Sequence, residues 1–227
     1  MLKKEITEIL SASKNQGWVL EPEAKRIFSL IGLEVPRFLW TTKTEEALRF
    51  AKEMGYPVVG KIVSPKVLHK SDQNGVAVGI KDDRELAETF ERFSRIEGFA
   101  GILVEEMVSG LELIAGSKVD YQFGPVILLG MGGTGVEIYR DISLRMAPLS
   151  QKDIENMINC LKAHRLLEGY RGRAPIDRVK LIELLKTFSD LVMDLENWVE
   201  SIDLNPIMCS SKRSVIADAR IILNKAE

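Results

Sequence analysis

The chain has 227 residues, of which 45% are hydrophobic and 28% charged, and its formal net charge is -2. These values are ordinary for a globular protein that forms one large domain or two subdomains. The small net charge and the lack of a long basic block argue against a nucleic-acid-binding protein. The amphipathic residues 1–10 contain no leader-like apolar run, so we expect a cytoplasmic chain without a membrane span, in which Cys160 and Cys209 are reduced core residues.

The first hundred residues alternate helical and extended patterns. Apolar residues at three- and four-residue spacing predict helices, and β-branched runs predict strands. Gly17 and Gly32 punctuate the first helical stretch, and Thr44 is the expected N-cap of the next helix. The predicted elements are two helices within 4–32, a strand at 35–40, a helix at 44–54, strands at 56–63 and 76–80, and a helix at 85–96.

The remainder begins with β-rich segments that favour antiparallel strands. A glycine run at 130–135 either lets a ligand approach the backbone closely or simply supplies positive φ angles. His164, on a helical segment, is expected to be structural or exposed. The predicted elements are strands at 101–108, 112–119, 126–129 and 136–141, helices at 150–167 and 177–195, a basic turn at 169–175, and strands at 198–207 and 214–221.

A loop between the strands at 56–63 and 76–80 places a histidine among lysines. Lys61 lies on the first strand, and His69 and Lys70 lie in the loop that closes at Gly75. Two ammonium groups and an imidazole on one turn favour an anionic ligand such as phosphate. The alternative is that Lys61 is a solvated strand residue and His69 an ordinary surface residue.

Three oxygen-bearing residues mark the last two strands. Alternation places Asp203 and Asn205 on one face, and the paired strand can bring Asp218 opposite them. Such oxygen ligands suit Mg²⁺, which binds through one or two protein groups and nucleotide phosphates. From spacing alone, Asp and Asn residues that flank a proline turn remain the simpler interpretation.

Taken together, the motifs resemble the nucleotide-binding β subunit of ADP-forming acyl-CoA synthetases, an ATP-grasp family that is related to succinyl-CoA synthetase. The resemblance covers essentially the whole chain. Its motifs are Glu23-Ala24-Lys25, Gly55-Tyr56-Pro57-Val58-Val59, Lys61-Ile62-Val63-Ser64-Pro65, Leu68-His69-Lys70-Ser71-Asp72, Val104-Glu105-Glu106-Met107, Phe123-Gly124-Pro125-Val126, Gly130-Met131-Gly132-Gly133, Arg145-Met146-Ala147-Pro148-Leu149, Gly169-Tyr170-Arg171-Gly172, Asp203-Leu204-Asn205-Pro206 and Asp218-Ala219-Arg220.

The resemblance implies a role for each candidate residue. His69 matches the transiently phosphorylated histidine, and Asp203 the carboxylate that hydrogen-bonds its ring. Where the family commonly has a Gly-Gly pair, this chain has Asn74 and Gly75, and we expect Asn74 to tolerate the positive φ. The remaining implied contacts are Lys61, Lys70 and Gly75 for the nucleotide phosphates and their loop, Glu105, Glu106 and Met107 for adenine, Glu112 for ribose, Gly132 and Gly133 for the glycine loop near the site, and Asn205 and Asp218 for Mg²⁺.

The resemblance also implies an α/β ATP-grasp fold whose two subdomains carry mixed or antiparallel sheets and enclose ATP or ADP with Mg²⁺. A small subdomain is expected at about 23–100, with the remainder at about 101–227 joined by the N-terminal helix. No CoA-binding fingerprint is present, because the glycine run at 130–135 leads into a predicted strand rather than a helix. The chain is therefore expected to act with a CoA-binding α subunit as an α2β2 assembly, without nucleic-acid or membrane partners.

Two other functions compete with this interpretation. One is a non-catalytic regulatory ATP-grasp module that has lost phosphoryl transfer, against which the joint presence of His69, Asp203, Asn205 and Asp218 argues. The other is an ATP-grasp ligase that forms an acyl phosphate without a phosphohistidine, against which His69 in its motif argues. The acyl group itself is not specified by the sequence.

Overall fold

The computed structural model describes residues 2–67, 70, 74–133 and 140–224. Contacts divide the chain into two units. Unit 1 comprises Met1–Val35 and Ser109–Glu227, and unit 2 comprises Pro36–Val108. The sequence places the smaller part at about 23–100. The contacts instead assign the helix at Glu21–Leu30 to unit 1, where it packs on the strand Ala219–Leu223, and the strand Gly101–Glu106 to unit 2, where it pairs with Val58–Val63.

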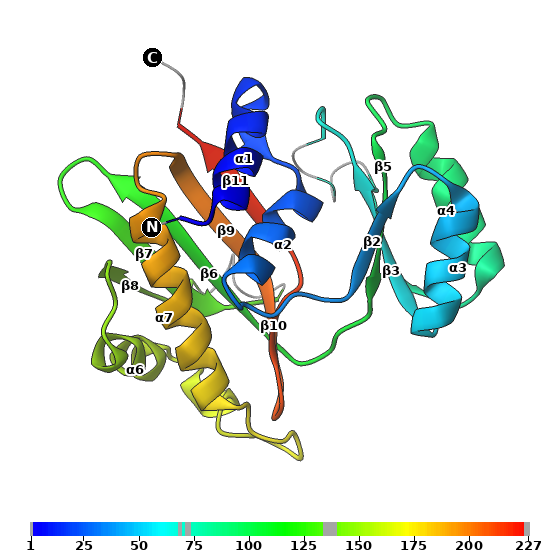
Figure 1. Cartoon of the computed structure of the whole chain (residues 1–227). Helices are drawn as coiled ribbons and strands as arrows, with labels where there is room; N and C mark the ends of the chain where they lie inside the picture. The colour runs from blue at the N-terminus through cyan, green and yellow to red at the C-terminus, as the bar shows by residue number, and fades with distance from the viewer. Residues whose placement is uncertain (1, 68–69, 71–73, 134–139, 225–227) are drawn as a thin grey trace. The chain divides into compact units, whose positions relative to one another are not determined.

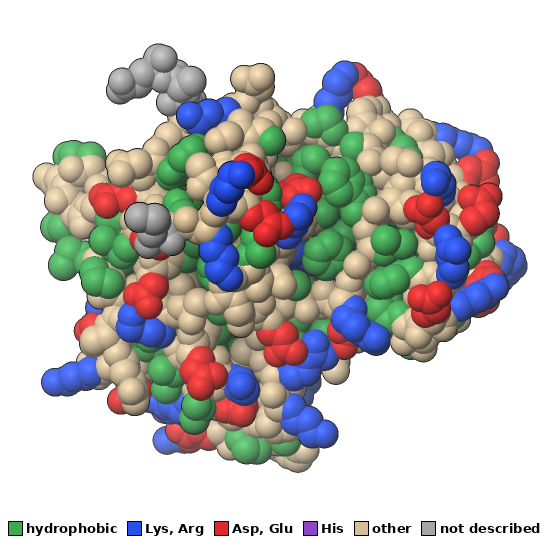
Figure 2. Space-filling view, viewed as in Figure 1, with side chains coloured by type: hydrophobic (Ala, Val, Ile, Leu, Met, Phe, Trp, Pro, Cys, Tyr) green, Lys and Arg blue, Asp and Glu red, His purple; other side chains and the backbone are tan. Residues whose placement is uncertain are grey.

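Unit 2 is an antiparallel sheet of order β2-β5-β3-β4 with two helices on one face (Figure 1). Phe93 on the second helix packs with Ile62 and Ile102 of the sheet, which fixes that face as the apolar one. Charged side chains of both signs alternate over the outer surface of the helices (Figure 2). The elements are β2 (Phe38–Thr41), α3 (Thr44–Met54), β3 (Val58–Val63), β4 (Val76–Ile80), α4 (Asp83–Ser94) and β5 (Gly101–Glu106).

Unit 1 is built on a seven-stranded sheet of order β1-β11-β9-β6-β7-β8, with β10 also paired to β9. Helices α1, α2 and α7 lie over one face of this sheet (Figure 1). The core joins Phe28 of α2 and Phe188 of α7 to Ile202 and Leu204 of β9. The elements are α1 (Lys4–Ser13), η1 (Lys14–Gln16), β1 (Trp18–Val19), α2 (Glu21–Leu30), β6 (Leu111–Asp120), β7 (Gly124–Met131), β8 (Ile142–Met146), α6 (Gln151–Cys160), η3 (His164–Leu166), α7 (Arg178–Asp194), β9 (Val199–Cys209), β10 (Ser214–Ile216) and β11 (Ala219–Leu223).

The described strand pairs are antiparallel, which confirms the prediction for the β-rich segments after residue 100 and agrees with the mixed or antiparallel sheets that the resemblance implies. In the part of the chain that the structure describes, no helix has the length and apolar content needed to cross a bilayer. The predicted strand at 136–141 lies mostly outside the described residues.

The predicted helix at 150–167 is wrong in its second half. α6 ends at Cys160, and Leu161 adopts an extended backbone with φ -66° and ψ 131°. The backbone N–H groups of Lys162 and Ala163 donate to the buried carboxylate of Asp141, at 2.7 and 2.8 Å. Because these two donors are taken from outside the helix, the α-helical ladder stops and a short 3₁₀ turn follows.

Smaller differences concern the ends of elements. Thr44 is the first residue of α3 rather than its N-cap, because Lys43 occupies that position without a side-chain cap. The predicted strand at 35–40 is shifted to Phe38–Thr41. The predicted strand at 214–221 is divided into β10 and β11, and Asp218 lies at the break.

Candidate functional site

β9, a central strand of the sheet in unit 1, carries Asp203 and Asn205 on either side of the buried Leu204. β11 runs antiparallel beside it, with Ala219 opposite Leu204. The backbone N–H of Asn205, on β9, donates to the carbonyl oxygen of Asp218 at 3.2 Å, so these two residues lie side by side. The structure thus brings together two of the three predicted oxygen ligands at the break between β10 and β11.

Asp203 has a cross-strand partner that sequence reasoning missed. Arg220 lies opposite Asp203 in the β9–β11 register, and its Nη2 is 3.3 Å from Asp203 Oδ2. The side chains are 31% and 44% exposed, so the pair sits at the surface of the sheet. Antiparallel pairing of Asp218 with Asn205 places residue 220 opposite residue 203, which is the signal that could have identified the pair.

A second group of predicted residues meets where β6 begins and β7 ends. The N–H of Gly132 donates to the carbonyl oxygen of Glu112 at 2.7 Å. A Cβ on Gly132 would lie 2.7 Å from both the Cβ and the carbonyl carbon of Glu112, so only glycine fits there. Gly133 follows with φ +92°, and a Cβ on it would lie 3.6 Å from Glu112 Oε2. The predicted glycine loop is therefore packed directly against the predicted ribose contact.

In unit 2, Lys61 and Glu105 lie on adjacent strands and on the same sheet face. Glu105 is opposite Val59, two residues from Lys61, so the two side chains meet diagonally. Lys61 Nζ is 3.0 Å from Glu105 Oε2. The ammonium is held at the strand centre with a carboxylate neighbour, which limits the positions that its head group can reach.

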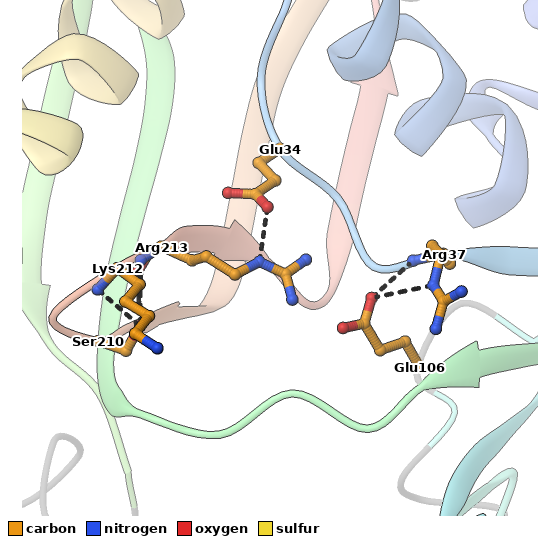
Figure 3. Close-up of polar contacts among 6 residues, drawn as sticks. All are labelled: Glu34, Arg37, Glu106, Ser210, Lys212 and Arg213. Carbon is orange, nitrogen blue, oxygen red and sulfur yellow. Dashed lines mark hydrogen bonds and ion pairs between the residues drawn. The ribbon is translucent and has the colours of Figure 1, made fainter. Parts of the chain in front are cut away.

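The next two residues after Glu105 have different environments. Glu106 is fixed to the segment before β2, because its N–H donates to the Arg37 carbonyl at 2.9 Å and its Oε2 accepts from the Arg37 N–H at 3.2 Å. The Arg37 Nε lies 3.8 Å from the same carboxylate oxygen (Figure 3). Met107 is 42% exposed. The Glu106 side chain thus holds the backbone on which Met107 is presented.

Of the predicted site residues in the loop after β3, the structure describes Lys70 and Gly75. Gly75 donates its N–H to the Lys70 carbonyl at 2.8 Å, and its own carbonyl accepts from the Ile62 N–H at 2.8 Å. A Cβ on Gly75 would lie 2.5 Å from Ile62 Cγ2. Asn74 has φ 52°, the conformation expected for it. His69 lies outside the described residues.

Other titratable candidates have structural environments. His164 Nδ1 is 2.8 Å from the Leu161 carbonyl oxygen, within its own turn. Cys209 is buried in β9, and burial raises the pKa of its thiol to about 11. The two cysteines are both free thiols, but Cys160 is exposed, so the expectation that it is a core residue is wrong.

Comparisons with known proteins agree with one another. A model of the ATP-grasp domain matches residues 11–223. The chain is 39% identical over 225 residues to the β subunit of ADP-forming acetate–CoA ligase I of Pyrococcus furiosus, covering 95% of this chain and 97% of the relative. It is similar to dinucleotide-forming acetyl-coenzyme A synthetase 1 of Ca. Korarchaeum cryptofilum in complex with coenzyme A and Ca-AMPCP, with 39% identity, a TM-score of 0.89, and coverage of 96% and 99% of the two chains. A second structure of that enzyme contains coenzyme A and Mg-AMPPCP, with its phosphohistidine segment pointing towards the nucleotide-binding site; it has 38% identity, a TM-score of 0.84, and coverage of 96% and 100%.

Proposed function

The chain belongs to the ATP-grasp family and, within it, to the β subunits of ADP-forming acetate–CoA ligases, and from this we propose that it is the nucleotide-binding, phosphoryl-transferring part of such a ligase. The reaction is acyl-CoA + ADP + phosphate ⇌ carboxylic acid + CoA + ATP. The observation that carries the proposal is the pairing of Asn205 with Asp218 beside Asp203, in a chain that covers 97% of the Pyrococcus furiosus β subunit.

The residues at the break between β10 and β11 fit a magnesium ion. Asn205 on β9 offers one amide oxygen, and Asp218, whose backbone it contacts, offers one carboxylate. Among the described residues there is no group of three His, Cys, Asp or Glu side chains that could hold a metal by themselves. An amide oxygen and a carboxylate are a suitable pair of protein ligands for Mg²⁺, which takes its other ligands from nucleotide phosphates and water. When bound, Mg²⁺ would neutralise charge on the phosphate oxygens.

Each unit contains residues that we propose as nucleotide contacts. In unit 2, Lys61 supplies a positive charge for the phosphates, and Lys70 and Gly75 belong to the loop that follows. The segment Glu105, Glu106 and Met107 offers backbone groups for adenine, and the Arg37–Glu106 contacts support its conformation. In unit 1, Glu112 lies against Gly132 and Gly133 and is proposed to contact the ribose.

His69 is the proposed phosphoryl acceptor. Near neutral pH, a neutral imidazole nitrogen can attack the γ-phosphorus of ATP, which breaks the bond to the bridging oxygen and releases ADP. In the reverse step ADP attacks the phosphoramidate, the nitrogen–phosphorus bond breaks and the imidazole leaves. Asp203 is proposed to orient the ring and to stabilise its cationic form, as a carboxylate does for a catalytic histidine elsewhere. A carboxylate accepts several hydrogen bonds, so the contact with Arg220 is compatible with this role.

The assembly and location are proposals of the same kind. The relative is named as a subunit, which supports a partner subunit for this chain. We propose that the partner binds CoA, that the assembly is α2β2, and that it acts in the cytoplasm.

Phosphoryl transfer to His69 tests the function directly. The chain is incubated with γ-labelled ATP and Mg²⁺, alone and with a CoA-binding α subunit of the family. An acid-labile, base-stable label on this chain is expected, and it should vanish in His69→Ala while ADP affinity remains nearly unchanged. His164→Ala is the matched control and should keep the label. A label that persists in His69→Ala would contradict the assignment, and the lack of any label on the wild-type chain would favour the regulatory module.

A further inference from the structure

A charged pair is buried beneath the proposed magnesium site. Lys25 lies on α2 with 0% of its side chain exposed, and Glu21, one helical turn earlier, is 6% exposed. Lys25 Nζ is 2.9 Å from Glu21 Oε1. Removing two charges from water is costly, and a buried ion pair is often no more stabilising than apolar side chains of the same volume. The pair therefore calls for an explanation other than stability.

The ammonium reaches the strand break that carries Asp218. Lys25 Nζ donates to the carbonyl oxygen of Ala217 at 2.8 Å. That carbonyl belongs to the peptide unit that joins Ala217 to Asp218. β10 pairs with β9 before this point and β11 pairs with β9 after it. The carbonyl at the break is thus held by a side chain from α2.

The same break is held from β9 on its other side. The N–H of Ala217 donates to the Pro206 carbonyl at 3.0 Å, and the Asp218 carbonyl accepts from the Asn205 N–H at 3.2 Å. The hydrogen bond from Lys25 holds the break from a third side, because α2 lies in the helical layer that covers the sheet. Ala24 and Phe28, on the same helix, are fully buried, so α2 is a rigid support for the lysine.

We infer that Lys25 is a positioning residue for Asp218, and that Glu21 keeps this support electrically neutral. The inference rests on the proposed function, since it assumes that Asn205 and Asp218 hold Mg²⁺ with the nucleotide. Lys25 acts through its hydrogen bond to the Ala217 carbonyl. This bond fixes the orientation of the Ala217–Asp218 peptide, and with it the direction in which the Asp218 side chain points. An unpaired buried ammonium near a cation site would repel the cation, and Glu21 cancels that charge.

The test separates the metal from the nucleotide. ADP affinity is measured by calorimetry in EDTA and in saturating Mg²⁺, and the ratio of the two affinities reports the metal's contribution. The variant Glu21→Gln/Lys25→Met removes the hydrogen bond to Ala217 without leaving a buried charge. We expect its Mg²⁺ ratio to fall about 10-fold or more, as is usual for residues that orient metal ligands, while the affinity in EDTA is unchanged.

A matched control exists on α7. Lys186 and Asp190 form an exposed pair with the same four-residue spacing, with Nζ 2.5 Å from Oδ1. The variant Lys186→Met/Asp190→Asn should keep the wild-type ratio. Near-ultraviolet circular dichroism checks that each variant is folded. Should the buried double variant not fold, Glu21→Gln alone is used, and its uncompensated ammonium is expected to lower the Mg²⁺ ratio in the same direction.

The outcomes are distinct. A folded double variant, or failing that a folded Glu21→Gln variant, with the wild-type ratio would overturn the positioning role and leave the proposed function intact. A loss of ADP affinity that is equal in EDTA and in Mg²⁺ would also overturn it, because it would indicate a general structural effect. A wild-type chain whose ADP affinity does not respond to Mg²⁺ would contradict the proposed function itself, and the inference with it.

Discussion

The guanidinium of Arg220 lies 3.3 Å from the Asp203 carboxylate, across the ladder that joins β9 to β11. Asp203 is proposed to orient the phosphorylated histidine, so Arg220 limits the positions that this carboxylate can adopt. The pair is partly exposed, and pairs of that kind contribute little to stability, about 0–1 kcal/mol. Its importance is expected in the reaction rather than in folding.

Arg220→Met is therefore predicted to slow phosphoryl transfer to His69 while lowering the free energy of unfolding by less than about 1 kcal/mol. Labelling from γ-labelled ATP gives the rate, and urea unfolding gives the stability. Lys180→Met is a suitable control, since Lys180 forms an exposed pair with Glu183 at 3.5 Å. A labelling rate equal to that of the wild type would show that Asp203 does not depend on Arg220.

The oxygen residues at the strand break should differ in their effect on metal-dependent binding. Asn205→Ala and Asp218→Ala are predicted to remove most of the gain in ADP affinity that Mg²⁺ provides, because each removes a proposed ligand oxygen. Asp203→Ala should reduce that gain only weakly. Asp203→Asn should slow phosphoryl transfer without abolishing it, because an amide still orients the ring but supplies no charge. Calorimetry with ADP and Mg²⁺ measures the first effect, and unchanged affinity in both ligand variants would eliminate the metal assignment.

Gly132→Ala should destabilise unit 1 by about 1–3 kcal/mol, the usual cost of forcing an extra group into a packed site. The added Cβ would lie 2.7 Å from the carbonyl carbon of Glu112, and backbone cannot move aside as a flexible side chain can. Gly116→Ala is the comparison, because its Cβ would meet only the Ile202 carbonyl oxygen, at 3.2 Å. Urea unfolding should show the larger loss for Gly132→Ala, and equal losses would argue against a close approach at Glu112.

The N-terminus of α6 offers a test that depends on pH. Ser150 and Asp153 form a capping box, and hydrogen bonds from Ser150 hold the pKa of the Asp153 carboxyl below its ordinary value. Because the pKa is lower in the folded state than in the unfolded one, the Asp153 carboxylate stabilises the folded state. This contribution is fully present at a pH above the ordinary pKa of the carboxyl, and it is lost as the pH falls through the lowered pKa of the folded state. Ser150→Ala should cost about 1 kcal/mol near pH 7.

The difference in stability between the wild type and Ser150→Ala should narrow as the pH falls below about 4, the ordinary pKa of an Asp carboxyl, and on through the lowered pKa that Asp153 has in the folded state. Urea unfolding at a series of pH values measures it. Ser94→Ala serves as the control, because the Ser94 hydroxyl donates to the Glu91 carbonyl, which does not titrate. A Ser150→Ala difference that is as independent of pH as that of the control would contradict the assignment.

Apolar periodicity and β-branched runs are sufficient to predict most helices and strands, because the residues that form the buried face of each segment recur at a regular spacing within that segment. The stop of α6 at Cys160 could not be predicted in this way, since it depends on Asp141, a residue distant in sequence. The two-residue strand β1 has no periodic signal at all.

The candidate site was predictable to different degrees. The neighbouring positions of Asn205 and Asp218 follow from strand alternation and antiparallel pairing. The contact of Arg220 with Asp203 needs the register as well. The link from Lys25 to Ala217 spans 192 residues and joins a helix to a strand break, so no local pattern in the sequence indicates it.

Unit 2 is one uninterrupted stretch, Pro36–Val108, whereas unit 1 is divided into the segments before and after it. On the ribosome, unit 2 can complete its sheet while most of unit 1 has not yet been synthesised. The apolar faces of α1 and α2, which include Leu10 and Phe28, stay uncovered until β9 and β11 have been synthesised, more than 150 residues later in the chain. The newly made N-terminal helices are thus the part of the chain most exposed to wrong contacts during translation, and the part for which chaperone protection would matter most.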